Sequence, residues 1–133
     1  MKSKTFILIN AILFFLIVSA CSKEEPDRVD DLLIGLWMLS EKTVDSEPII
    51  LDDCEKQSSL EFHENNLVTI YDACNETSIN SGWIYRYDML NIAVHLPAGY
   101  YIDHLDNTTL KISRYDLSTG GDRLVTTLTY LKQ

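Results

Sequence analysis

Apolar residues alternate with polar or small ones through most of the chain beyond residue 33. In the clearest run, Leu90, Ile92, Val94 and Leu96 are each separated by one polar or small residue. A repeat of two places alternate side chains on opposite faces, as in a β-strand that buries one face. The pattern therefore predicts an all-β domain, preceded only by a short helical turn over Val29 to Leu33.

Eight strands are predicted from runs rich in Val, Ile, Leu, Thr and Tyr. They are Ile34 to Val44, Ser58 to His63, Leu67 to Asp72, Ser78 to Tyr87, Met89 to Leu96, Tyr100 to Leu105, Thr108 to Tyr115 and Arg123 to Lys132. Turn-forming segments separate several of them, namely Glu64-Asn65-Asn66, Pro97-Ala98-Gly99, Asp106-Asn107 and Ser118 to Gly121. These connections are too short for parallel crossovers, so we expect a small eight-stranded antiparallel up-and-down barrel, with a two-sheet sandwich as the alternative.

The first twenty residues have a different pattern. Lys2 and Lys4 precede an apolar run from Phe6 to Val18, which ends in Ser19-Ala20-Cys21. This order resembles a bacterial lipoprotein signal peptide, which is cut before a cysteine that becomes the lipidated N-terminus. We therefore expect residues 1–20 to be removed and Cys21 to carry the lipid. The alternative is a transmembrane helix, for which the apolar run is short.

Residues 21–32 are expected to act as a tether, because the charged stretch around Pro26 has nothing apolar to bury. Within it, Lys23-Glu24-Glu25 resembles the export signal that sends lipoproteins of the Bacteroidota to the cell surface. An arbitrary polar linker is the alternative. The predicted location is the outer membrane, lipid-anchored and exposed at the cell surface.

The charge balance excludes some partners. The chain of 133 residues has 11 Lys and Arg against 20 Asp and Glu, for a net charge of −9, and removal of the leader with its two lysines makes it more acidic. Nucleic-acid binding depends on Lys and Arg that neutralise phosphates, so no nucleic-acid partner is expected. The lipid, and not the acidic protein surface, would provide membrane attachment.

Cys54 and Cys74 remain once Cys21 is assigned to lipidation. In a compartment where disulfides persist, a bridge between them would close a loop of about 20 residues and stabilise a small domain by roughly 3 kcal/mol. A metal-binding or redox pair is the alternative, although the spacing is not Cys-x-x-Cys and no third ligand is evident.

A family resemblance rests on several short motifs in order. Gly35-Leu36-Trp37 opens the first strand, and Leu60-Glu61-Phe62, Gly82-Trp83 and Leu90-Asn91-Ile92 follow, with Cys54 and Cys74 between them. Their order resembles the lipocalin-like lipoprotein domains of the Bacteroidota. The resemblance covers about residues 33–131, within a predicted domain of residues 33–133, and it implies an eight-stranded barrel, a Cys54–Cys74 bridge and Trp37 at the closed end. Arg123 is then the only candidate for the arginine that covers this tryptophan in lipocalins.

Aromatic residues are the candidate ligand-binding groups. Trp83 and Tyr85 share one face of a strand, and Tyr100 and Tyr101 flank a turn. Aromatic side chains at a barrel mouth would hold an apolar or sugar ligand. In the competing interpretation they only fill the interior of a small barrel.

No catalytic or metal-binding pattern stands out. With a turn at Pro97 to Gly99, His95 would lie opposite Tyr100 or Tyr101, away from His104, and His63 would be solvated beside a turn. The acidic run Asp52 to Glu55 lacks the spacing of a calcium loop. We therefore expect no enzyme, no cofactor and no metal site, with catalysis by His95 or His104 as a remote third possibility.

The leading hypothesis is a lipid-anchored envelope protein that binds a small hydrophobic or amphipathic molecule without catalysis. The alternative is a filled barrel that serves as a structural or protein-interaction module, with an envelope protein touching the loops at Asp45 to Glu55 and Ser118 to Asp122.

Overall fold

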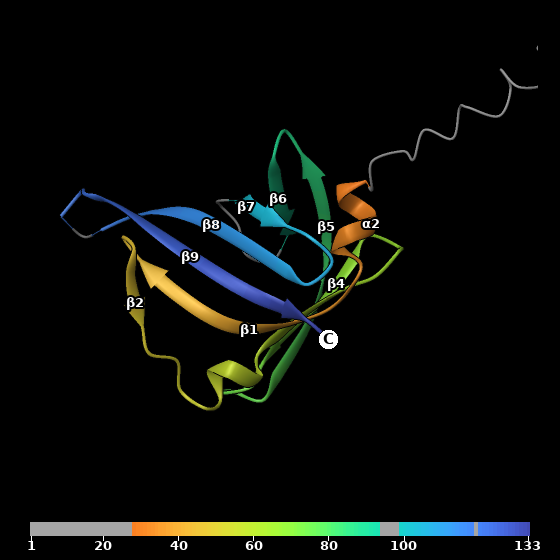
Figure 1. Ribbon diagram of the computed structural model, residues 1–133, viewed down its shortest axis with the longest axis horizontal. Coiled ribbons are helices and arrows are strands. Elements are labelled where there is room, and N and C mark those ends of the chain that lie inside the picture. Colours follow the sequence, from red (N-terminus) through yellow and green to blue (C-terminus); the bar gives the residue numbers. More distant parts are fainter. Residues whose placement is uncertain (1–27, 94–98, 119) are drawn as a thin grey trace, which may run out of the picture.

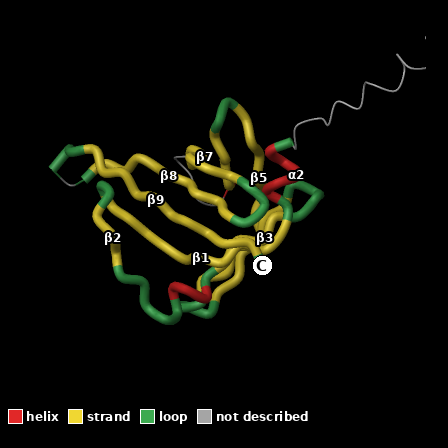
Figure 2. The backbone as a smooth tube through the Cα atoms, viewed as in Figure 1, coloured by secondary structure: helices red, strands yellow, loops and turns green. Residues whose placement is uncertain are grey.

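The computed structural model describes residues 28–93, 99–118 and 120–133 (Figure 1). The elements in this part of the chain are a helix, a single 3₁₀ turn and nine strands (Figure 2). They are α2 (Val29–Leu33), β1 (Gly35–Val44), β2 (Glu47–Ile49), η2 (Glu55–Gln57), β3 (Ser59–Phe62), β4 (Leu67–Asp72), β5 (Thr77–Arg86), β6 (Met89–Ile92), β7 (Tyr100–Leu105), β8 (Thr109–Leu117) and β9 (Arg123–Lys132).

Eight of the strands form a closed antiparallel barrel. From β3 to β9 each strand pairs with the next, β3 also pairs with the first half of β1, and β1 pairs with β9 to close the sheet. Closure leaves no long unpaired edge among these strands, which removes a site for aggregation. The prediction of an eight-stranded up-and-down barrel is confirmed, as is the helical turn at Val29–Leu33.

Strand β2 is an addition that the sequence pattern did not reveal. It pairs with the second half of β1 through Val44↔Glu47 and Lys42↔Ile49. All three of its residues are exposed, so it has no alternation of buried and exposed positions that would mark it as a strand. The turn before it places Asp45 and Ser46 at positive φ, which suits a tight hairpin.

The hairpin between β6 and β7 is longer than predicted. Leu90 pairs with Tyr100, whereas a tight turn at Pro97 to Gly99 would have placed His95 opposite Tyr100 or Tyr101. Both Leu90 and Tyr100 are buried, so the register follows the pairing of inward-facing side chains and not the local turn residues. The predicted strand Met89 to Leu96 is seen as far as Ile92; residues 94–98 lie outside the described part.

The core closes one end of the barrel. Trp37 is fully buried, and its indole Nε1 donates a hydrogen bond of 2.7 Å to the main-chain oxygen of Leu33 in α2. Leu33 is itself fully buried, and Val29 packs against the same cluster. The folded part thus includes a helix that precedes the predicted domain boundary at residue 33. The buried cluster comprises Leu33, Trp37, Leu60, Phe62, Val68, Trp83, Leu90, Ile92, Tyr100, Leu110, Ile112 and Tyr130.

The residue that covers Trp37 is not Arg123. The Arg123 guanidinium lies 3.6 Å from the ring centre of Tyr115 on the outer face. Lys132, at the end of β9, places its ammonium 5.0 Å from the centre of the Trp37 ring. The reason is positional, because Lys132 pairs directly with Trp37 in the β1–β9 ladder, while Arg123 pairs with Leu117 at the far end of β9.

Cys54 and Cys74 form a disulfide, with their Cα atoms 4.9 Å apart. The bridge connects the segment before η2 to the turn between β4 and β5, which confirms the predicted pairing. Helix, strands, core and disulfide all lie within residues 28–133, so this segment has what a domain needs to fold on its own. Among the described residues, no helix has the length and apolar character needed to cross a membrane.

Candidate functional site

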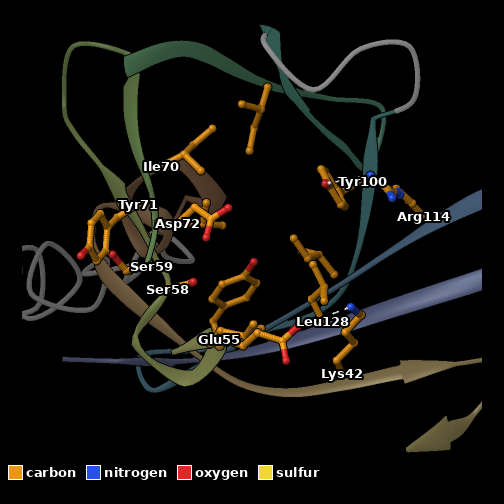
Figure 3. Close-up of a pocket in the computed structure, with 15 residues that line it drawn as sticks. Lys42, Glu55, Ser58, Ser59, Ile70, Tyr71, Asp72, Tyr100, Arg114 and Leu128 are labelled. Atoms are coloured by element: carbon orange, nitrogen blue, oxygen red, sulfur yellow. Dashed lines mark hydrogen bonds and ion pairs between the residues drawn. The ribbon is translucent and has the colours of Figure 1, made fainter. Parts of the chain in front are cut away.

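A cavity of about 540 Å³ opens between the inner faces of the strands (Figure 3). This volume lies within the range of about 300–1,000 Å³ found for small-molecule sites. Seven of the barrel strands and the η2 segment contribute to its lining. The barrel therefore has room for a ligand and is not filled by its own side chains.

The cavity has an apolar part and a polar part. Six aliphatic side chains supply the apolar surface: Leu39, Leu60, Ile70, Ile92, Ile112 and Leu128. Three tyrosines and six charged or hydroxyl-bearing residues complete the lining: Tyr71, Tyr100, Tyr130, Lys42, Glu55, Ser58, Ser59, Asp72 and Arg114. Such a lining suits an amphipathic ligand, because tail and head group each find matching surroundings.

A β-bulge in β1 brings Lys42 into this cavity. Leu39 pairs with Tyr130 and Lys42 pairs with Leu128, with a register shift between Leu39 and Glu41. Tyr130 and Leu128 share the inner face, so both Leu39 and Lys42 also point inward. Without the extra residue, Glu41 would take the inward position, since side chains alternate along a regular strand.

The acidic residues of the lining are engaged in local contacts. Glu55 lies 3.9 Å from the Lys42 ammonium and accepts a hydrogen bond from the main-chain amide of Asp52. Asp72 accepts hydrogen bonds from the side-chain and main-chain amides of Asn75 and from the main-chain amide of Cys74. The hydrogen bonds, with that from the Asn75 side chain the strongest, lower the pKa of Asp72, so this carboxylate stays ionised at neutral pH.

Arg114 and Tyr100 lie side by side on the opposite wall (Figure 3). The Arg114 Nη1 atom is 3.5 Å from the Tyr100 hydroxyl, and Nε donates to Asp116 at 2.8 Å. The contact with Asp116 raises the pKa of Arg114, which keeps the guanidinium cationic. Arg114 continues the inward-facing series of Leu110 and Ile112 on β8, so its inward position follows from the period of two.

The four predicted ligand-binding aromatics do not gather at one mouth. Of the four, Tyr100 alone lines the large cavity. Trp83 is buried, donates a hydrogen bond from Nε1 to the main-chain oxygen of Leu67, and packs edge-to-face on Phe62. Tyr85 packs against the core and bonds through its hydroxyl to Asp88. Burial and that bond raise the pKa of Tyr85.

Trp83 instead lines a second cavity of about 470 Å³, together with Asp30, Asp31, Ile34, Glu64 and Asn66. Two of these residues belong to α2, so this cavity lies at the closed end. Tyr101 points to the outer face, where it contacts Tyr115 edge-to-face. Neighbours on one strand face opposite sides, so Tyr100 and Tyr101 cannot both line the interior.

Sequence reasoning missed Lys42, Arg114 and Tyr130 as lining residues. A usable signal existed for two of them. Arg114 continues the series of alternate, inward-facing residues Leu110 and Ile112, and Tyr130 lies two residues after the inward-facing Leu128. A charged or hydroxyl-bearing side chain in phase with a buried apolar series is a candidate for an interior site. No such pattern marks Lys42, because the bulge shifts the alternation of inward- and outward-facing residues along β1 by one position.

The histidines are far from forming a common site. His63 contacts the Thr69 hydroxyl at 3.0 Å, and His104 contacts Asp106 at 2.9 Å next to the β7–β8 turn. His95 lies outside the described residues. Across the described ranges there is no group of three or more His, Cys, Asp or Glu side chains placed to hold a metal ion.

Together, the closed eight-stranded barrel, the buried tryptophan at its closed end and the interior cavity define a lipocalin-like β-barrel. The lipocalin-like domain family matches residues 33–113, and the chain belongs to this family. No curated protein matches the chain.

Solved structures share the fold at low sequence identity. Bovine odorant-binding protein complexed with its natural ligand is similar at 16% identity and a TM-score of 0.50, over 84% of this chain and 77% of that chain. The complex of the same bovine protein with a selenium-containing odorant gives 15% identity and a TM-score of 0.50, over 85% and 78%. These similarities establish the shared barrel.

Proposed function

We propose that the chain is a lipid-anchored envelope protein whose barrel binds a small hydrophobic or amphipathic molecule. Sequestration is the mechanism, with no bond made or broken. The observation that carries this proposal is the cavity of about 540 Å³ with aliphatic and polar parts. The bovine odorant-binding protein that shares the fold is complexed with its natural ligand, which supports binding as the use of this cavity.

A cavity-filling variant tests the binding proposal. Leu128→Trp would place an indole in the cavity, whereas Leu117→Trp adds the same group at a position that is 81% exposed. We expect residues 28–133 to bind an apolar naphthylamine dye, the Leu117→Trp variant to bind it equally, and the Leu128→Trp variant to lose binding. Equal binding by all three proteins would place the dye outside the cavity and contradict the proposal.

Native mass spectrometry tests the proposal without a chosen ligand. Protein recovered gently from its own cell type should carry a discrete added mass that disappears on denaturation. That mass would identify the class of cargo. A bare monomer would instead favour the interaction module.

The anchor belongs to the same proposal. The leader that ends just before Cys21 and the neighbouring Lys23-Glu24-Glu25 support lipidation and display on the outer membrane at the cell surface. A Cys21→Ser variant of the full chain should leave the membrane fraction and lose incorporation of labelled fatty acid. Wild-type protein on intact cells should be digested by added protease. Persistent membrane attachment of the Cys21→Ser variant would contradict lipidation at this residue.

A protein-interaction role is the second candidate. Ile50 and Leu117 are 93% and 81% exposed, and they adjoin the loops at the ends of β2 and β8. In this second proposal the two side chains are contact points for an envelope protein, and alanine substitution of both should abolish its co-purification with the chain while leaving dye binding unchanged.

A further inference from the structure

Side chains on the cavity wall built by β7, β8 and β9 have N–H and O–H groups that form few hydrogen bonds within the protein. Tyr100, Arg114 and Tyr130 come from these three strands and line the same cavity. The acidic side chains of the lining, Glu55 and Asp72, already accept hydrogen bonds from main-chain amides. On the wall formed by Tyr100, Arg114 and Tyr130, by contrast, N–H and O–H donors remain available to a ligand.

Tyr130 is the most informative of the three. Its side chain is 7% exposed, and its hydroxyl has no hydrogen-bond partner among the described residues. Every fully enclosed side-chain nitrogen or oxygen in the described part does have a partner, so this hydroxyl must be open to the cavity. Burial raises the pKa of Tyr130, which keeps the group protonated and able to donate.

Arg114 retains donors on the same wall. A guanidinium has five N–H groups, of which one is given to Asp116 from Nε at 2.8 Å. The contact between Nη1 and the Tyr100 hydroxyl is long, at 3.5 Å. Arg114 thereby keeps N–H groups for a ligand and stays fixed in position by Asp116.

We propose that the cavity selects an amphiphile with an oxyanion head group, a carboxylate with an aliphatic tail. The head group accepts hydrogen bonds from Arg114, Tyr100 and Tyr130. The tail lies against Ile70, Ile92 and Ile112 on the apolar part of the lining. This inference rests on the proposed function, since it names the ligand class for the same cavity.

The charge of the lining shapes the expected selectivity. Arg114 also donates a hydrogen bond to Asp116, whose negative charge offsets the positive charge of the guanidinium. Recognition of the head group therefore depends on directed hydrogen bonds more than on net positive charge. Charge-assisted hydrogen bonds of this kind are about twice as strong as neutral ones. An alcohol of the same chain length has no anionic acceptor, so its bonds with the Tyr100 and Tyr130 hydroxyls would be neutral and only the bond from Arg114 would be charge-assisted. An ammonium has three donors and no acceptor, so it cannot accept from the N–H groups of Arg114, and the like charge of the guanidinium repels it.

Calorimetric titration of residues 28–133 at neutral pH tests the proposal with three probes: dodecanoic acid, dodecanol and dodecylamine. We expect the acid to bind about tenfold more tightly than the alcohol, and the amine to bind most weakly. Tyr130→Phe and Arg114→Gln should each weaken binding of the acid by about tenfold and weaken binding of the alcohol by a clearly smaller factor. Thermal unfolding of each variant verifies that it is folded.

Matched controls lie on the outer face. Tyr101→Phe removes the hydroxyl next to Tyr100 in sequence, and Arg123→Gln removes a guanidinium that lies over Tyr115. Neither change should alter binding of the acid. Arg114→Lys keeps the charge but loses the planar fork, and should recover part of the affinity lost in Arg114→Gln.

Two failures are distinguishable. If dodecanol or the naphthylamine dye binds, but the acid binds no more tightly and Tyr130→Phe has no effect, the head-group inference is wrong and the binding function stands. If neither the dye nor any of the three probes binds to the folded protein, both the inference and the proposed function are overturned.

Discussion

The ammonium of Lys132 lies 5.0 Å from the centre of the Trp37 ring and donates a hydrogen bond of 3.0 Å to the main-chain oxygen of Leu32. The last strand, the first strand and the helix that precedes the barrel are joined at this point. Trp37 in turn donates to Leu33. The closed end is therefore held by two bonds to the C-terminal end of α2, where the helix dipole favours a cation.

Replacing Trp37 tests the contribution of the closed end. Trp37→Ala removes a fully buried indole and should lower the free energy of unfolding by about 3–5 kcal/mol. Leu36→Ala is the control, because Leu36 is the adjacent residue and is 36% exposed. Urea unfolding measures both. An unchanged unfolding midpoint for Trp37→Ala would contradict the role given to the indole.

Lys132 makes a smaller contribution. Lys132→Ala should cost about 1–2 kcal/mol through loss of the cation–π contact and of the hydrogen bond to Leu32. Lys132→Arg keeps a cation over the ring and should restore most of this loss. The exposed Lys111 provides the control substitution to alanine. Equal effects at Lys111 and Lys132 would mean that the contact with Trp37 stabilises nothing.

Gly35 allows the chain to enter β1 with a φ of +128°, a conformation that other residues avoid. A Cβ at this position would also lie 2.8 Å from Cε of Lys132. Gly35→Ala is expected to lower stability by about 1–3 kcal/mol, mainly through backbone strain. Gly82→Ala serves as control, since the nearest atom to its Cβ would be 4.0 Å away. Equal melting temperatures for the two variants would argue against strain at Gly35.

The disulfide borders the cavity. Cys54 precedes Glu55, and Cys74 follows Asp72 by two residues, and both acids line the cavity. The double variant Cys54→Ser/Cys74→Ser should lose about 3 kcal/mol of stability and bind the naphthylamine dye more weakly. A reducing agent should reproduce both changes in the wild type and have no effect on the double variant. Unchanged dye affinity after reduction would show that the bridge does not shape the mouth.

Asp106 organises the β7–β8 turn and links stability to acidic pH. Its carboxylate accepts hydrogen bonds from His104, from the amide and hydroxyl of Thr108 and from the amide of Thr109. These bonds, with that from His104 the strongest, lower the pKa of Asp106 from its ordinary value of 3.8.

Because the pKa is lower in the folded state, this stabilisation is complete above the unfolded value and is lost as the pH falls through the folded value. The wild type should therefore lose stability below about pH 4, while Asp106→Asn, already weaker at neutral pH, should lose less. Urea midpoints over this range measure the difference. Asp53→Asn, at an exposed position, should behave as the wild type. Parallel pH profiles for Asp106→Asn and wild type would contradict the assignment.

Local sequence was enough to predict most of the strands. The ends of seven predicted strands lie within two residues of the observed ones, and Leu90, Ile92, Leu110 and Ile112 are buried as the alternation requires. The reason is that side-chain direction in a strand depends on the backbone alone and repeats every two residues. The same rule assigns Arg114 to the interior and separates Tyr100 from Tyr101.

Which residues come together in the cavity and at the closed end depends on contacts between distant parts of the chain. Pairing of β1 with β9 joins residues about ninety positions apart, and it decides that Lys132, and not Arg123, covers Trp37. The bulge after Leu39 exists only within that pairing, and it turns Lys42 into the cavity. Trp83 lies at the closed end because the second half of β5 pairs with β6, near α2. By itself the sequence determined the strands and their buried faces, since these are local properties. The tertiary structure decided which inward-facing residues share the cavity, because register and closure arise only when all the strands are paired.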